Sequence, residues 1–109
     1  MYLQHFLFLD GNSTASSSPL IVNSKGGTLK LSVEKLSNVS VDITVKGKID
    51  KASSTFFDVA VFKLADFSTI TKINDEGLYA IDVNGISEIK LVNNGTAGSV
   101  KALGVVVDG

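Results

Sequence analysis

The sequence lacks cysteine and tryptophan altogether, and it contains a single histidine and a single proline. Without cysteine there can be no disulfide bond and no thiolate chemistry. One histidine, His5, is too few for the usual zinc ligand sets, and it lies beside Phe6 in a predicted strand with no nucleophile near it in the sequence. We therefore expect no enzymatic activity, no cofactor and no metal, and a structural or interface role for His5.

Arginine is also absent, so all ten basic residues are lysines, spread from Lys25 to Lys101. With eleven acidic residues the formal net charge is −1. Proteins that bind nucleic acids cluster their positive charge and use the arginine fork to read phosphates and guanines. We therefore expect no direct binding to nucleic acid.

Long apolar runs are missing as well. The one near the start, Tyr2 to Leu9, is interrupted by Gln4 and His5 and follows no basic residue. A transmembrane helix needs roughly 20 apolar residues, and a signal peptide needs a basic segment before its apolar one. We interpret this stretch as a strand and expect no membrane partner.

Apolar residues instead recur with a period of two, which is typical of strands. Leu29, Leu31 and Val33 alternate with polar residues, and the segment from Val39 to Val45 repeats the pattern. No part of this 109-residue chain shows a sustained helical period, so we predict one all-β domain over residues 1–109. The predicted strands are 2–9, 19–23, 28–34, 39–48, 56–64, 67–73, 78–83, 87–92 and 99–107.

Turn signals separate these strands about every 8–12 residues, as in sandwiches and barrels. Asn84-Gly85 is the clearest of them, since its glycine can take a positive φ. About eight strands in a chain of this length favour an antiparallel β-sandwich of the jelly-roll type. An immunoglobulin-like sandwich is the alternative, although the Cys–Trp–Cys hallmark is missing. The Ser-rich segment Gly11–Pro19 is predicted to be a flexible loop, or an arm that becomes ordered against a partner.

Several strands carry more apolar residues than one buried face requires. In the first strand Leu7 and Leu9 point one way and Phe6 and Phe8 the other, and the valine run 105–107 is apolar on both faces. Covering loops are one explanation, but a subunit contact accounts better for so many apolar groups. We therefore expect a homo-oligomer, with a trimer or hexamer favoured. The predicted oligomer or particle contacts are Phe6, Phe8, Phe56 and Val106.

Aspartates cluster at the predicted turns, where such side chains bond to the nearby backbone. No EF-hand spacing accompanies them, so we interpret Asp75 and Asp82 as turn residues. Jelly rolls also serve as lectin domains, which leaves a carbohydrate- or receptor-binding module as an alternative function. Its ligand would be a glycan, bound by Tyr79, Asp82 and Asn84 or by the loop 12–18, although the chain has two tyrosines and no tryptophan to stack on a sugar.

A series of short elements occupies roughly the last two-thirds of the chain, from Val39 onward. They are Gly47-Lys48-Ile49-Asp50, Phe56-Phe57, Gly77-Leu78-Tyr79-Ala80-Ile81-Asp82-Val83-Asn84-Gly85, Ile89-Lys90-Leu91 and Gly98-Ser99-Val100. In this order they resemble the small β-sandwich structural proteins encoded in the virion gene clusters of tailed bacteriophages. The sequence departs from that pattern at Phe56-Phe57, where related chains often have tryptophan, and this departure argues further against sugar stacking.

The resemblance implies a virion component without enzymatic activity: a capsid decoration or head-fibre-like protein, or a tail or baseplate accessory. Such proteins are usually symmetric oligomers. The resemblance therefore implies that the partners are further copies of this chain and other virion proteins. It also implies localisation in the virion, after assembly in the host cytoplasm.

Overall fold

The computed structural model describes residues 2–10, 20–21, 27–37, 40–50, 52–94 and 100–108. Within these ranges every regular element is a strand and none is a helix, so the all-β prediction is confirmed. The strands are β1 (Tyr2–Asp10), β2 (Leu20–Ile21), β3 (Thr28–Lys35), β4 (Ile43–Lys48), β5 (Phe57–Asp58), β6 (Val61–Lys63), β7 (Thr69–Ile70), β8 (Gly77–Asp82), β9 (Glu88–Asn93) and β10 (Val100–Asp108).

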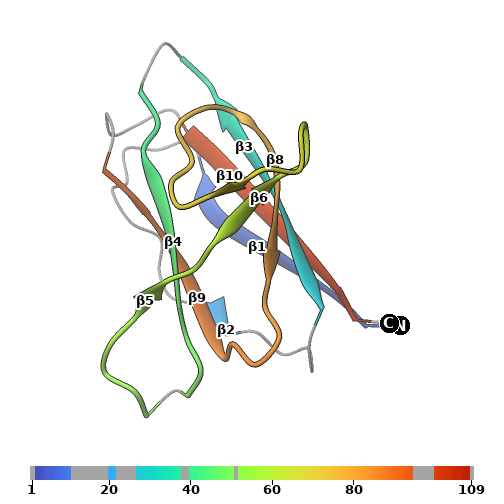
Figure 1. Ribbon diagram of the computed structural model, residues 1–109, viewed down its shortest axis with the longest axis vertical. Coiled ribbons are helices and arrows are strands. Elements are labelled where there is room, and N and C mark those ends of the chain that lie inside the picture. Colours follow the sequence, from blue (N-terminus) through green and yellow to red (C-terminus); the bar gives the residue numbers. More distant parts are fainter. Residues whose placement is uncertain are drawn as a thin grey trace.

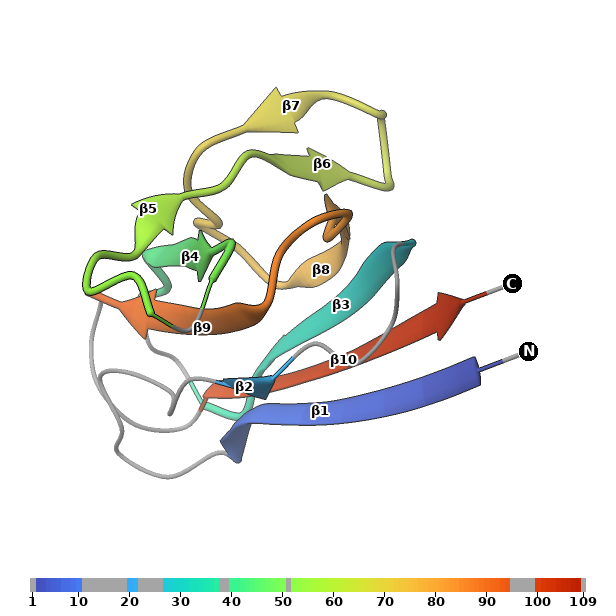
Figure 2. The ribbon, with the colours of Figure 1, turned by 90° about the horizontal axis from the view of Figure 1, so that it is seen from below.

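The strands form two sheets in which every pairing is antiparallel, and the sheets pack against each other as a sandwich (Figures 1 and 2). The six-stranded sheet has the order β1-β10-β3-β8-β6-β7, and the four-stranded sheet has the order β2-β9-β4-β5. Strands β1 and β10 pair from Tyr2 opposite Asp108 to Asp10 opposite Lys101. The first and last described residues therefore lie side by side.

This strand order is that of a jelly roll. The chain changes sheets repeatedly between β1 and β4 and again from β8 to β10, so that β1, β10, β3 and β8 in one sheet face β2, β9, β4 and β5 in the other. The first and last strands are antiparallel neighbours, an arrangement that the two sheets of an immunoglobulin domain do not have. The jelly-roll prediction is confirmed, and the immunoglobulin-like alternative is not.

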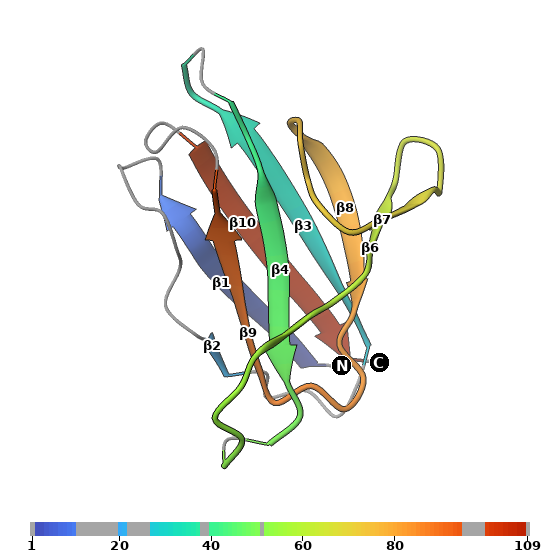
Figure 3. The same cartoon turned by 60° about the vertical axis from the view of Figure 1, so that its left-hand side comes forward.

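The predicted strand 56–64 is divided in two because the chain changes sheets within it. Strand β5 pairs with β4, and β6 pairs with β8 in the other sheet. Strand β7 then returns beside β6, and this hairpin extends the larger sheet beyond β8 (Figure 3). The predicted strand 67–73 is correspondingly short, and Ile73 instead forms an isolated bridge with Ile43.

The core lies between the sheets and follows the period of two. In β3 the side chains of Leu29, Leu31 and Val33 are buried and those between them are more exposed, as predicted. Ile43 and Val45 of β4 face them from the other sheet. Burying one such side chain stabilises the fold by about 1.5–3 kcal/mol, so the alternating strands account for most of the core. Val39 and the Ser-rich segment Gly11–Pro19 lie outside the described residues.

Candidate functional site

The outer face of the six-stranded sheet is apolar at its centre. Leu7 of β1 lies opposite Leu103 of β10, Leu103 lies opposite Ser32 of β3, and Ser32 lies opposite Leu78 of β8. Leu7 is 56% exposed, Leu78 61% and Leu103 38%. These fractions are large for leucines within strands, and they arise because the four-stranded sheet covers only the opposite side. We call this surface, which also includes His5, Phe62, Leu64 and Val105, the apolar face.

The apolar face is hollowed rather than flat. A groove of about 470 Å³ runs across it, with His5 and Val105 on one side and Leu64 and Leu78 on the other. His5 lies opposite Val105, and Val105 lies opposite Lys30. The lysine carries the charge nearest the centre of the groove, and the polar pair Glu34 and Lys101 lies further along the same strands.

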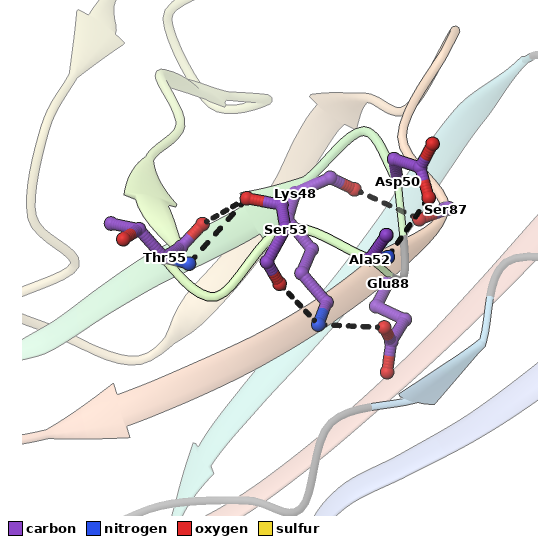
Figure 4. A network of polar contacts seen from close by, with 7 residues as sticks. All are labelled: Lys48, Asp50, Ala52, Ser53, Thr55, Ser87 and Glu88. Atoms are coloured by element: carbon purple, nitrogen blue, oxygen red, sulfur yellow. Dashed lines mark hydrogen bonds and ion pairs between the residues drawn. The ribbon is translucent and has the colours of Figure 1, made fainter.

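The outer face of the four-stranded sheet has the opposite character. Lys46 Nζ lies 2.8 Å from Asp58 Oδ1, and Lys48 Nζ lies 3.0 Å from Glu88 Oε2. Lys48 Nζ also donates to the backbone carbonyl of Ser53 at 3.0 Å, which ties the loop between β4 and β5 to β9 (Figure 4). The exposed pair Lys46–Asp58 is typical of a solvated surface, whereas the Lys48–Glu88 pair is more covered, with side chains 13% and 19% exposed. The sandwich therefore has one apolar outer face and one charged outer face.

Phe56 lies on this charged side. Its ring centroid is 5.0 Å from Lys48 Nζ and 4.4 Å from Lys90 Nζ, within the range of a cation–π interaction. The side chain is half-buried within the chain itself. Its predicted role as an oligomer or particle contact stays a prediction.

The other three predicted contact residues lie in the core, and this is a correction. Phe6 is 4% exposed, Phe8 5% and Val106 0%, so their side chains have almost no surface to offer a partner. The rings of Phe6 and Phe8 stack with centroids 5.4 Å apart, between the two sheets. The prediction correctly placed Phe6 and Leu7 on opposite faces of β1. It took the face of Phe6 as exposed, whereas the face of Leu7 is the exposed one. Both faces are apolar, so the period of two alone could not identify the buried one.

The predicted ligand-binding residues do not form a common site. Tyr79 is buried on the inner side of β8, and its hydroxyl donates to the backbone carbonyl of Asp75 at 2.6 Å. Burial, together with the negative charge of Asp75, raises the pKa of Tyr79 above its usual value. Asp82 and Asn84 are exposed on the turn after β8, where Asp82 accepts hydrogen bonds from the backbone and side-chain amides of Asn84. The turn interpretation of Asp82 is confirmed, and a buried Tyr79 cannot stack on a sugar.

Leu7, Leu78 and Leu103 were not predicted as surface residues, although signals for two of them exist. Leu103 lies between Ala102 and Gly104, which are small but fully buried, so the largest side chain of the three is the exposed one. Leu78 shares a face with the exposed Asp82, whereas Tyr79 shares the buried face with Ile81 and Val83, so the period of two places Leu78 outside. Among the residues that the structure describes, no group of three or more His, Cys, Asp or Glu side chains could hold a metal ion. No helix long and apolar enough to cross a membrane occurs in that part of the chain.

No protein-family model matches the chain, and no curated protein matches it in sequence. Two solved structures share its fold. The SPBc2 prophage-derived protein YomS aligns with a TM-score of 0.84 and 16% identity, over 98% of this chain and 94% of YomS. The PBSX exported protein XepA aligns with a TM-score of 0.80 and 20% identity, over 96% of this chain and 37% of XepA. This chain therefore spans little more than a third of XepA. The likeness establishes the fold, and it agrees with the resemblance to small β-sandwich proteins of phage origin.

Proposed function

We propose that this protein is a non-enzymatic structural component of a phage or prophage-derived particle, and that it assembles through the apolar face. The observation that carries the proposal is the row Leu7, Leu103, Ser32 and Leu78, whose three leucines are exposed on a sheet face that no other described strand covers. The prophage origin of YomS, whose fold this chain shares over nearly its whole length, supports the association with phage.

The size of the apolar face fits a protein contact. Strands β1, β10, β3 and β8 have nine, nine, eight and six residues. With strands about 4.8 Å apart and a rise of about 3.3 Å per residue, they span a planar area of roughly 500 Å². A specific interface buries about 800 Å² on each partner, and apolar area contributes about 25 cal/mol per Å². The face could therefore supply more than half of such an interface, and side chains at its rim would have to supply the remainder.

The contrast between the two outer faces supports a component with a fixed orientation. The charged face, with Lys46–Asp58 and Lys48–Glu88, loses little by remaining in water. The apolar face gains by being covered. In the proposed role the apolar face contacts further copies or a neighbouring particle protein, and the charged face points to solvent. A capsid decoration protein or a tail or baseplate accessory, present as a trimer or hexamer, meets this description.

The contact is tested with Leu78→Asp, which places a carboxylate at an exposed position in the apolar face. Leu36→Asp is the matched control, because Leu36 is 53% exposed just after β3 and Leu78 is 61% exposed. Light scattering after size exclusion should give a smaller assembly for Leu78→Asp and an unchanged one for Leu36→Asp. Equal masses for the two variants and the wild type would refute the contact.

The particle association is tested separately, by quantitative mass spectrometry of particles purified from a host that carries the gene. The wild-type chain and Leu36→Asp should be present in the particles at a constant ratio to the major capsid or tail protein. Leu78→Asp should be strongly depleted from them while remaining folded in the lysate. If the wild-type chain stays in the lysate and is absent from particles, the virion role is wrong.

A further inference from the structure

The edges of the two sheets are very unequal. Strands β2 and β5 close the four-stranded sheet and β7 closes one side of the larger sheet, and each has two residues. Strand β1 closes the other side with nine residues, and among the described strands its one neighbour is β10 (Figure 2). An edge strand presents a row of backbone N–H and C=O groups that a further strand can pair with, so long edges are normally protected.

The usual protections are scarce along β1. Between Tyr2 and Leu9 the sequence has no lysine, no carboxylate and no proline, which are the residues that most often discourage pairing at an edge. A register shift between Leu7 and Leu9 is the one irregularity, and it leaves the pairing with β10 regular from Tyr2 to Leu7. This part of β1 is therefore a straight, uncharged edge suited to accepting another strand.

We propose that β1 pairs in antiparallel fashion with β1 of a second copy of this chain, which joins two six-stranded sheets into one. This inference rests on the self-association in the proposed function and specifies a second contact for it. A second copy fits because it offers an edge of the same length and character. An uncharged strand can also lie against itself without bringing like charges together across the two-fold axis.

The two-fold axis would run perpendicular to the sheet, so each residue pairs with one whose side chain points to the same side. His5 and Leu7 of one copy then lie beside the same outer residues of the other, while Phe6 stays within the core layer of each sandwich. The apolar faces of the two copies become one continuous surface. A two-fold contact at β1 combined with a three-fold contact through that surface closes as a hexamer where the two axes cross at right angles.

The mass test is made in the Leu78→Asp background, where the contact through the apolar face is removed. The remaining species should be a dimer of about 23 kDa, twice the 11.5 kDa of one chain. Adding Leu7→Lys should return it to a monomer, because a lysine on an edge strand disfavours pairing with a further strand. Adding Leu36→Lys should leave the dimer intact, since Leu36 is exposed to a similar degree, 53% against 56% for Leu7, but lies outside β1.

Amide hydrogen exchange measured by NMR tests the pairing itself. In a free edge strand every second amide faces solvent and exchanges fast. In a strand that is paired on both sides every amide is hydrogen-bonded and exchanges slowly. Protection of all amides from Leu3 to Leu7 in the dimer would support the proposal. An alternating pattern at the concentration where the assembly forms, or a monomeric Leu78→Asp, would overturn it. If Leu78→Asp has the same mass as the wild type, the apolar face is not the contact. The amide exchange pattern of β1 then still tests the pairing of the edge strands.

Discussion

Gly104→Ala should destabilise the protein, because Leu29 of β3 and the ring of Phe8 of β1 occupy the space that a side chain at this position would need. Gly104 lies in β10 between Phe6 of β1 and Leu31 of β3. A Cβ atom built on it would lie 2.8 Å from Leu29 Cδ1 and 2.9 Å from Phe8 Cε2. Carbon atoms pack at about 3.5–4.0 Å, so both side chains would have to move in a core with no spare volume.

The magnitude follows from two opposing terms. Overpacking a core costs about 1–3 kcal/mol, and alanine recovers about 0.4–1 kcal/mol by restricting the unfolded chain. We expect a net loss of about 1–2 kcal/mol in the free energy of unfolding, and a fall in Tm of roughly 5–10 °C. Circular dichroism during thermal unfolding measures it. Gly47→Ala is the control in the other sheet, where the nearest atom to a new Cβ is 3.2 Å away, and its effect should be smaller.

The cause is isolated by repeating the substitution with Phe8→Leu already present. If the crowding comes from the Phe8 ring, the penalty for Gly104→Ala should fall by at least half in that background, as a coupling between contacting residues requires. A Gly104→Ala protein as stable as the wild type would show that Phe8 does not pack over β10. That result would reopen the earlier prediction that Phe8 is a surface contact.

Two further predictions concern buried polar groups. Tyr79→Phe removes the hydrogen bond to the carbonyl of Asp75 and should cost about 0.5–1.5 kcal/mol in urea unfolding at neutral pH. Because the folded-state pKa of Tyr79 is raised, the unfolded chain loses that proton first, and the advantage of the wild type over Tyr79→Phe should shrink as the pH rises through 10. An advantage that stays constant up to pH 11 would contradict the burial of this hydroxyl. Lys48→Ala leaves the carboxylate of Glu88, whose side chain is 19% exposed, without its lysine and should cost about 1–3 kcal/mol. Lys46→Ala breaks a far more exposed ion pair and should cost about 0–1 kcal/mol. Equal losses of unfolding free energy for Lys48→Ala and Lys46→Ala would contradict the view that the more covered pair contributes more.

The strands with one apolar and one polar face could be predicted from the sequence. In β3, Leu29, Leu31 and Val33 alternate with polar residues, and this pattern identifies both the strand and its buried side. The turn at Asn84-Gly85 was predictable for a similar reason, since few residues other than glycine tolerate the φ of 76° found at Gly85. Many such strands separated by turns indicate a sandwich or barrel, and the jelly-roll order itself is given by the pairing of the strands.

The functional face could not be predicted in the same way. In β1 and β10 both sides are largely apolar, and in β1 the polar residues Gln4 and His5 lie on opposite sides, so they do not indicate which side meets water. The choice is made by tertiary packing: Gly104 leaves room for Phe8, and the rings therefore point inward. Leu7 and Leu103 are left outside as a consequence. The division of residues 56–64 between β5 and β6 was equally inaccessible, because a change of sheet leaves no signature in the period of two.

The most direct test of the central claim, that the apolar face is a contact between proteins, is the solution molar mass of the wild-type chain by light scattering across a range of concentrations. We predict a stable assembly with a mass that is a whole multiple of 11.5 kDa, a trimer or a hexamer. A mass of 11.5 kDa at every concentration would mean that no second copy covers Leu7, Leu78 and Leu103, and would contradict self-association.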